Sequence, residues 1–321
     1  MTTTWFEKTR EQQLLRLQQL EPVMGLLANN VEKDFWLTFV LNQIFAFPRA
    51  QDTFVFMGGS NLYKCYDIVK RFSEDIDLAI KHSALGFSGD LSKNQINKKL
   101  RPVSQEFVKR QLFEHLQKQL NGFPCTVDLV YEGEVPIINV RYQSVTPDLV
   151  SYNPPIIKIE AEGRFISTPA QSREVTTPVD LGLKFNVPSL LPSSTLLQKI
   201  FLLYEEFRKP QVKIRSERMS RHLYDIYRVW YFSEYKNDVL NPKFYQEGRD
   251  LQLKFRPQGL TIDDYNPDKL TILPQDQAQE AYAEDYEQMK QSMIYDPDAP
   301  TFEKLLEKLA LVQDEINKIK L

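Results

Sequence analysis

Cysteine is scarce in this sequence, whose 321 residues include only Cys65 and Cys125. Two thiols are too few for a disulfide framework or a thiolate zinc site. They fit a reducing compartment, so we expect a cytoplasmic protein. The first residues lack the apolar core of a signal peptide. No apolar run approaches the ~18 residues that span a bilayer, and we expect no membrane association.

An excess of one charge is also lacking. The 40 lysines and arginines and the 43 aspartates and glutamates give a formal net charge of -3. No global basic field therefore attracts nucleic acid to the protein. This does not exclude an RNA substrate, because a local basic patch or bound cations would be enough.

Helical patterns lie at both ends of the chain, and short strand-like runs lie in the middle. Strands are expected at 53–57, 75–80, 125–131, 136–145 and 156–161, with a long helix over 93–120. The proline-containing stretch 163–192 is expected to be a connecting region. We therefore expect an N-terminal helical segment (1–50), an α+β core (51–192) and a C-terminal helical domain (193–321).

Two aspartates, Asp75 and Asp77, lie in the second strand-like run. Because side chains alternate along a strand, both carboxylates project from one face, about 7 Å apart. Neighbouring carboxylates repel each other unless a cation lies between them. Mg²⁺ is held in proteins by one or two carboxylates together with phosphates and water. We therefore predict a magnesium site at these two residues.

A glycine turn, Gly58-Gly59-Ser60, follows the first expected strand and opens a short helical stretch. Glycine lets backbone N–H groups approach a ligand closely, and the start of a helix suits phosphate. The Ser60 hydroxyl would add a donor. Either motif alone is usually a plain turn or a solvated strand. Their order, strand, glycine turn, helix and strand, predicts that a triphosphate and a metal meet here.

Gly58-Gly59-Ser60 followed by Arg71-Phe72-Ser73-Glu74-Asp75-Ile76-Asp77-Leu78 resembles the signature of the AbiEii/AbiGii toxin family of nucleotidyltransferases, which includes the mycobacterial MenT toxins. The resemblance implies a DNA polymerase β-like nucleotidyltransferase core with a mixed sheet, followed by a C-terminal helical bundle. It implies Mg²⁺, an NTP co-substrate, and the toxin part of a toxin–antitoxin or phage-defence (abortive infection) system. The expected antitoxin partner is a winged-helix, AbiEi-like protein. Some members modify tRNA 3′ ends, which makes tRNA the favoured acceptor.

The resemblance extends to two downstream motifs. Lys199 matches the family's motif lysine and would contact the triphosphate, although a solvated helix lysine is the simpler interpretation. The family's next motif reads Arg-Asp-x-x-Asp, whereas this chain has Arg221-His222-Leu223-Tyr224-Asp225. Either His222 replaces a catalytic acid as a different acid–base group, or Asp225 keeps that role. Arg221 and Asp225 could also form a plain i, i+4 ion pair.

A third carboxylate is usual on a neighbouring strand of polymerase β-like sites. Glu160 alternates with Ile157 and Ile159 and shares a face with Lys158, and Asp128 is the competing candidate. We favour Glu160, which would complete the metal shell or accept the proton of the attacking hydroxyl. A structural salt bridge is the alternative interpretation.

The C-terminal half intersperses basic residues with aromatic ones. They are Arg208, Lys209, Lys213, Arg215, Arg218, Arg221 and Arg228, with Tyr204, Tyr224, Tyr227 and Trp230. Such residues can hold phosphates and stack on bases, or they can form a solvated helix face.

Three functions are compatible with these motifs. The first is nucleotide transfer from an NTP to an RNA 3′-hydroxyl, with release of pyrophosphate. The second is the same chemistry on a protein side chain or on a small molecule such as an aminoglycoside. The third is a non-catalytic module that binds nucleotide, RNA or an antitoxin, for which the departure at His222 is the main support.

Overall fold

The computed structural model describes residues 4–146, 154–177, 182–255 and 259–321. The chain forms two compact units. One consists of Met1–Cys65 and Phe72–Leu190, and the other of Tyr66–Arg71 and Leu191–Leu321. The segment 66–71 therefore belongs to the second unit, although the chain on either side of it belongs to the first. Within the described ranges, no helix is both long and apolar enough to cross a membrane.

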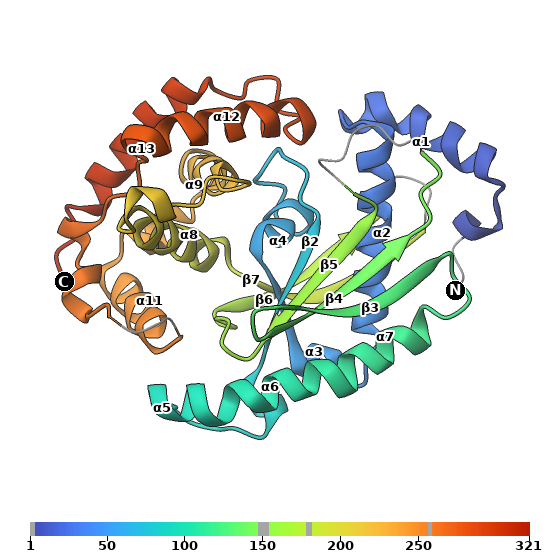
Figure 1. The fold of residues 1–321 in the computed structure, drawn as a ribbon, viewed down its shortest axis with the longest axis horizontal. Coiled ribbons are helices and arrows are strands. Elements are labelled where there is room, and N and C mark those ends of the chain that lie inside the picture. The colour runs from blue at the N-terminus through green and yellow to red at the C-terminus, as the bar shows by residue number, and fades with distance from the viewer. Residues whose placement is uncertain (1–3, 147–153, 178–181, 256–258) are drawn as a thin grey trace. The chain divides into compact units, whose positions relative to one another are not determined.

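The first unit is built on a mixed sheet of seven strands in the described part of the chain. The strands are β1 (Phe54–Met57), β2 (Asp75–Ile80), β3 (Cys125–Glu132), β4 (Val135–Tyr142), β5 (Ile156–Glu162), β6 (Ala170–Thr176) and β7 (Lys184–Leu190). Their order is β3-β4-β5-β2-β1-β7-β6 (Figure 1). β2 runs parallel to β5, and β1 runs parallel to β7. The predicted α+β class with a mixed sheet is confirmed.

The prediction that 163–192 is a connecting region is wrong. β6 and β7 form an antiparallel hairpin, and β7 joins the sheet next to β1. β6 is an edge strand whose side chains are mostly exposed and polar, so hydrophobic alternation does not mark it. Pro188 lies within β7, where proline normally argues against a strand. Residues 178–181 of this stretch lie outside the described residues.

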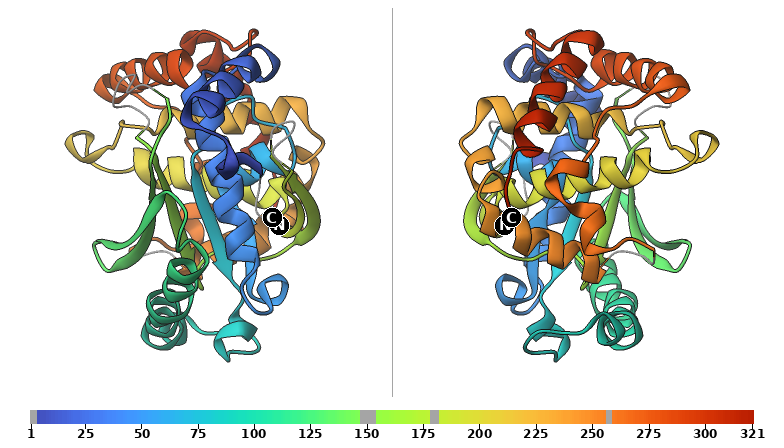
Figure 2. Two further views of the ribbon diagram at one scale, coloured as in Figure 1. Left: turned by 90° about the vertical axis from the view of Figure 1, so that its right-hand side faces the viewer. Right: turned by 90° about the vertical axis from the view of Figure 1, so that its left-hand side faces the viewer.

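Helices flank the sheet of the first unit. They are η1 (Thr4–Glu7), α1 (Arg10–Met24), α2 (Ala28–Phe45), α3 (Ala50–Thr53), α4 (Gly58–Lys64) and η2 (His82–Leu85). A continuous helical stretch follows, made of α5 (Lys93–Gln95), η3 (Ile96–Leu100), α6 (Arg101–Phe107), η4 (Val108–Leu112) and α7 (Phe113–Gln119). α2 packs against β2, β5 and α7 (Figures 1 and 2). This arrangement covers the apolar face of the sheet.

The predicted helix over 93–120 is confirmed, and its apolar stripe is confirmed in most positions. Ile96, Leu100, Leu112 and Leu116 are all at most 1% exposed. Val103 was expected in the same stripe but is 42% exposed. η3 and η4 are π-helical segments, which change the angular spacing of side chains along the helix. A strict 3.6-residue period therefore misplaces some of its positions.

The second unit is helical in its described residues beyond Leu191. Its helices are α8 (Pro192–Phe207), η5 (Gln211–Lys213), α9 (Ser220–Phe232), α10 (Lys236–Val239), α11 (Pro242–Phe255), η6 (Ile262–Tyr265), η7 (Pro267–Lys269), α12 (Asp276–Ser292) and α13 (Phe302–Ile316). α9 packs against α8, α12 and α13 (Figure 1). The predicted final amphipathic helix is confirmed, because Leu305, Leu309 and Val312 of α13 are fully buried.

A buried ion pair fixes the start of β2 to α2. Lys33 Nζ lies 2.5 Å from Glu74 Oε2, and the two side chains are 2% and 4% exposed. Lys33 Nζ also donates to the Pro154 carbonyl at 2.8 Å. Glu74 directly precedes Asp75, so the pair helps to set where the strand that carries the two aspartates begins.

Replacing Lys33 by methionine is expected to lower the free energy of unfolding by about 3–5 kcal/mol, because the buried Glu74 carboxylate would lose the ammonium that lies 2.5 Å from it. Arg110→Met is the matched control. It breaks the Arg110–Glu106 pair, whose side chains are 73% and 59% exposed, and is expected to cost less than about 1 kcal/mol. Urea unfolding measures both, and equal losses would contradict the role of the Lys33–Glu74 pair.

Candidate functional site

The two aspartates of β2 project from the same face of the sheet. Asp75 and Asp77 are half-buried, whereas Ile76 and Leu78 between and after them are fully buried. The alternation follows from the pleat of the strand, whose apolar face packs on the core. The shared face predicted for the two carboxylates is therefore confirmed.

The glycine turn lies directly against Asp77. Met57, the last residue of β1, is paired with Asp77 in the sheet, and α4 begins at the next residue, Gly58. Gly58 has a φ of +78°, and a Cβ on it would lie 2.0 Å from Asp77 Oδ2. Only glycine tolerates both the backbone conformation and the close carboxylate. The structure thus brings together the two motifs that the sequence separates by a helix.

Ser60 joins the two motifs through its side chain. It is 1% exposed, and its hydroxyl contacts the carbonyl of Asp75 and, at 3.0 Å, the hydroxyl of Ser73. Ser73 belongs to the segment that leads into β2. The sequence predicts a phosphate contact for this hydroxyl. In the structure the hydroxyl instead joins α4 to the start of β2. A phosphate contact at this residue, or at Gly59, would come from a backbone N–H in the first turn of α4.

The sheet places the two candidates for the third carboxylate at different distances from Asp77. Glu160 is paired with Asp77 in the neighbouring parallel strand β5. Asp128 lies on the edge strand β3, three positions away in the strand order, and pairs with Arg141 at 3.1 Å. With strands about 4.8 Å apart, Asp128 is roughly 14 Å from β2. Glu160 therefore fits a shared site and Asp128 does not.

Glu160 also takes part in a salt bridge, as the alternative interpretation predicts. Lys158 Nζ lies 2.9 Å from Glu160 and 2.6 Å from Glu132. Burial alone would lower the pKa of Lys158, but these two carboxylates outweigh it and raise the pKa. Lys158 therefore stays cationic next to the acidic face of β2 and β5.

The donor set of this face suits Mg²⁺ only in part. Asp75, Asp77 and Glu160 carry the carboxylate oxygens that Mg²⁺ prefers, and the Asp77 carboxylate lies against the backbone of Gly58. Among the described residues, no three His, Cys, Asp or Glu side chains are arranged to hold a metal by themselves. Water and substrate phosphates would have to complete the shell, as is usual for Mg²⁺.

A second cluster of predicted residues lies within the helical unit. Lys199 Nζ is 3.0 Å from Asp225 Oδ2 and 3.1 Å from His222 Nδ1. Arg71 binds both carboxylate oxygens of Asp225, at 2.7 Å each. Arg71 is 1% exposed and Asp225 is fully buried. Lys199 is 8% exposed, so it is not a solvated helix lysine.

Arg71 is the residue of this cluster to which the sequence assigned no role. The sequence did mark Arg71, because it is the first residue of the signature that ends at Leu78. Its partner is 154 positions away, and no local spacing identifies such a pair. The sequence suggested Arg221 as an i, i+4 ion-pair partner of Asp225. In the structure Arg71 binds both carboxylate oxygens of Asp225, so Asp225 also has a structural function.

Charge and burial oppose each other in this cluster. Burial alone would raise the pKa of Asp225, but Arg71 and Lys199 outweigh it and hold the pKa below its ordinary value. Burial lowers the pKa of Lys199, and the neighbouring cations Arg71 and Arg221 lower it further. Asp225 acts in the opposite direction and raises it, but the pKa stays below its ordinary value. Asp225 is therefore an anion clamped between two cations.

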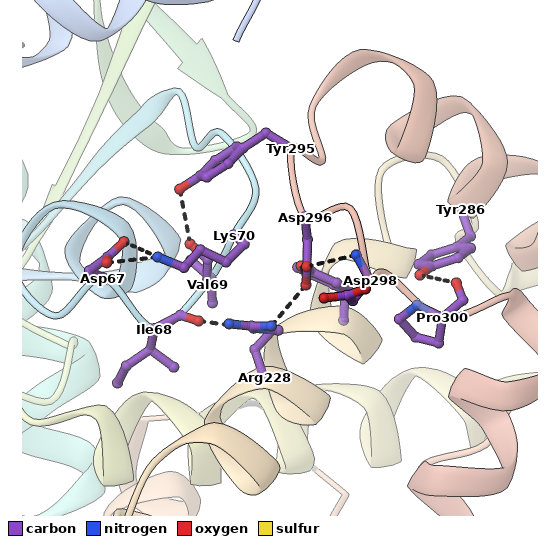
Figure 3. A network of polar contacts seen from close by, with 11 residues as sticks. Asp67, Ile68, Val69, Lys70, Arg228, Tyr286, Tyr295, Asp296, Asp298 and Pro300 are labelled. Carbon is purple, nitrogen blue, oxygen red and sulfur yellow. Dashed lines mark hydrogen bonds and ion pairs between the residues drawn. The ribbon is translucent and has the colours of Figure 1, made fainter. Parts of the chain in front are cut away.

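The segment 66–71 that carries Arg71 is held by the rest of the helical unit (Figure 3). Arg228 Nε donates to the Ile68 carbonyl at 3.0 Å and pairs with Asp296 at 2.8 Å. The N–H of Tyr295 donates to the Lys70 carbonyl at 3.1 Å. Arg71 itself forms an isolated antiparallel bridge with Ile294. These contacts fix the backbone from which Arg71 reaches Asp225.

The aromatic residues predicted to stack on RNA bases are mostly in the core. Tyr224 and Trp230 are fully buried and Tyr204 is 2% exposed. Tyr227 alone of the four predicted aromatics is half-buried. Arg228, one of the predicted basic residues, is 8% exposed and paired with Asp296. Tyr204, Tyr224 and Trp230 lie on the faces of α8 and α9 that point into the core. The prediction that these three side chains stack on RNA bases is therefore wrong.

Paired carboxylates beside a glycine turn, with a third on the next strand, define a site suited to phosphoryl transfer. A family model described as nucleotidyl transferase AbiEii toxin, type IV toxin–antitoxin system, matches residues 40–308. The chain belongs to this family of nucleotidyltransferase toxins, as its signature predicts.

Two solved structures from Helicobacter pylori resemble this chain. JHP933 is 15% identical with a TM-score of 0.41, and the match covers 90% of this chain and 91% of that one. A candidate nucleotidyltransferase is 16% identical with a TM-score of 0.40, and the match covers 91% and 97%. None of the curated proteins in the comparison matches the chain.

Gly58→Ala is expected to destabilise the protein more than Gly86→Ala. Both glycines have a left-handed φ, +78° and +80°, but a Cβ at Gly86 meets nothing within 4 Å. The backbone penalty of about 1–2 kcal/mol is therefore shared. The excess at Gly58, about 1 kcal/mol or more, reports the collision with Asp77.

Denaturant unfolding of the variants and of Gly58→Ala/Asp77→Ala measures this coupling. Removing the Asp77 carboxylate should remove most of the excess, because the nearest remaining atom of residue 77 is its Cβ, 3.2 Å from the added methyl group. The same loss in Gly58→Ala and Gly86→Ala would contradict the close approach.

Proposed function

We propose that this protein transfers a nucleotide from an NTP to the 3′-hydroxyl of an RNA, with tRNA as the favoured acceptor, in a magnesium-dependent reaction. The main support is the arrangement of Asp75, Asp77 and Glu160 on one face of β2 and β5, with Gly58 against Asp77.

The residues of the first unit would act by position and charge. Asp75 and Asp77 would hold Mg²⁺, which when bound stabilises charge on the attacking and leaving oxygens. Backbone N–H groups at Gly58, Gly59 and Ser60 would hold the phosphates. Glu160 would complete the carboxylate set or accept the proton of the attacking hydroxyl.

The bond changes are those of an in-line displacement. The acceptor oxygen forms a bond to the α-phosphorus, the bond from that phosphorus to the β-phosphate oxygen breaks, and pyrophosphate leaves. The hydroxyl proton passes to a carboxylate or to water. Lys199 would contact the triphosphate and balance the charge that develops on the pyrophosphate.

The choice of tRNA as acceptor rests on the family and on exposed basic residues. The family resemblance favours tRNA, while the buried aromatics of α8 and α9 remove one argument for RNA. Exposed basic residues such as Lys213 still offer phosphate contacts. A protein or small-molecule acceptor would use the same chemistry.

The biological setting follows from the family. A type IV toxin implies an antitoxin, and we propose a winged-helix protein of the AbiEi kind as this partner. Phage defence by abortive infection is the proposed role, and the cytoplasm, where NTPs and tRNA are available, is the proposed location.

Asp77→Ala is expected to lower nucleotide transfer by about a hundredfold or more, because an electrostatic contact to the reacting phosphate is lost. Glu160→Gln should also lower it. Asp128→Asn is the matched control and should stay within about twofold of wild type, since Asp128 is three strands away.

The measurement uses purified protein, Mg²⁺, each labelled NTP in turn, and either total tRNA or total protein. Label on tRNA with wild type and Asp128→Asn, but not with Asp77→Ala, supports the proposal. Label on protein and none on tRNA would show that the acceptor is a protein and not an RNA. Equal labelling by wild type and Asp77→Ala would overturn the mechanism.

A further inference from the structure

Among the described residues, the Lys199 ammonium contacts two partners, one fewer than the number of its N–H donors. An ammonium carries three N–H groups and no acceptor. One is directed to Asp225 Oδ2 at 3.0 Å and another to His222 Nδ1 at 3.1 Å. Lys199 is 8% exposed and lies on α8, and both of its partners lie on α9. A third N–H is therefore available to a ligand in a fixed orientation.

The contact with Lys199 determines the form of His222. Because Lys199 can only donate, His222 Nδ1 must accept with its lone pair, so the ring is neutral and carries its proton on Nε2. Burial lowers the pKa of His222, and the cations Lys199, Arg221, Arg71 and Arg215 lower it further. Asp225 is the acid of this cluster, and both of its oxygens are already bound.

Two cations of the cluster share one anion. Arg71 binds both carboxylate oxygens of Asp225, and Lys199 is paired with one of the same oxygens. The neutral ring of His222 orients the ammonium without neutralising it. A lysine held in this way is a preorganised contact for an anion such as a phosphate oxygen.

We propose that His222 is a positioning residue: as a neutral acceptor it holds the Lys199 ammonium so that the third N–H can bind a phosphate oxygen of the nucleotide. Protonation of His222 removes the acceptor and places a cation beside the ammonium, which releases this contact. The phosphate part of this inference rests on the proposed function, whereas the contact between Lys199 and His222 does not. His222 then serves the site through Lys199 and not as the acid–base group considered from the sequence.

Histidine NMR tests the contact without any nucleotide. The chain has three histidines, His82, His115 and His222, so the ¹⁵N signals of His222 are those lost in His222→Asn. We expect a proton on Nε2 only, and a ring that stays neutral well below pH 6.5. Lys199→Met should raise the pKa of His222, because a neighbouring cation is removed.

His115→Asn is the control for this measurement. His115 Nε2 contacts the Gln43 carbonyl at 2.8 Å in the other unit, so its loss should leave the His222 signals unchanged. A proton on Nδ1 of His222, or the same His222 pKa with and without Lys199, would overturn the inference.

Nucleotide binding and transfer test the consequence. His222→Ala should raise the KM for the NTP about tenfold, as expected for loss of a hydrogen bond to a charged group. His222→Asn should stay within about threefold, because Asn Oδ1 can accept in the place of Nδ1. The acidic limb of the pH profile should lie at lower pH in His222→Asn than in wild type, because asparagine does not titrate and only the carboxylates of the site then do.

The outcomes separate this inference from the proposed function. Pyrophosphate and each NTP are titrated into the full-length protein with Mg²⁺. If the NMR coupling is present but neither ligand binds, the proposed function fails together with the phosphate contact. If NTPs bind and react while His222→Ala and His222→Asn share the KM and pH profile of wild type, the inference about His222 alone fails.

Discussion

The close approach of the Asp77 carboxylate to Gly58 is the constraint on which the candidate site depends. The sheet pairs Met57 with Asp77, so the chain turns into α4 directly beside the acid. The absent side chain at position 58 lets the two meet, because a Cβ there would overlap Asp77 Oδ2. The buried contacts of Ser60 and the Lys33–Glu74 pair then fix the elements on either side.

Burial and charge are combined differently in the two units. On β2 and β5 the carboxylates are half-buried and share one face, with Lys158 as a neighbouring cation. In the helical unit a single buried anion, Asp225, is held between Arg71 and Lys199. An acidic face suits a cation, and a cluster with excess positive charge suits a phosphate.

The membership of Arg71 in the helical unit links the sequence signature to the fold. The signature begins in that unit and continues in the sheet unit from Phe72. Contacts of Arg228 and Tyr295 with the backbone of residues 68–70 keep this segment in place. One short motif thus supplies an acid pair to a sheet and an arginine to a helical cluster.

Local patterns predicted much of this protein, and long-range contacts account for what they missed. Alternation along Asp75–Ile80 predicted both the strand and the shared face of the acids, because a pleat has a fixed period of two. The hairpin of β6 and β7 was missed because an exposed, polar edge strand shows no such alternation. The choice between Glu160 and Asp128 needed the strand order, since both residues alternate equally well along their own strands.

The sequence by itself therefore determined the family, the paired acids of β2 and the glycine turn, all of which depend on residues close together in the chain. Only the tertiary structure decided that Arg71 clamps Asp225, that Lys199 is buried against His222, and that Tyr204, Tyr224 and Trp230 belong to the core. These facts depend on which faces of distant segments pack together. Packing of that kind is set by the whole chain and leaves no local period in the sequence.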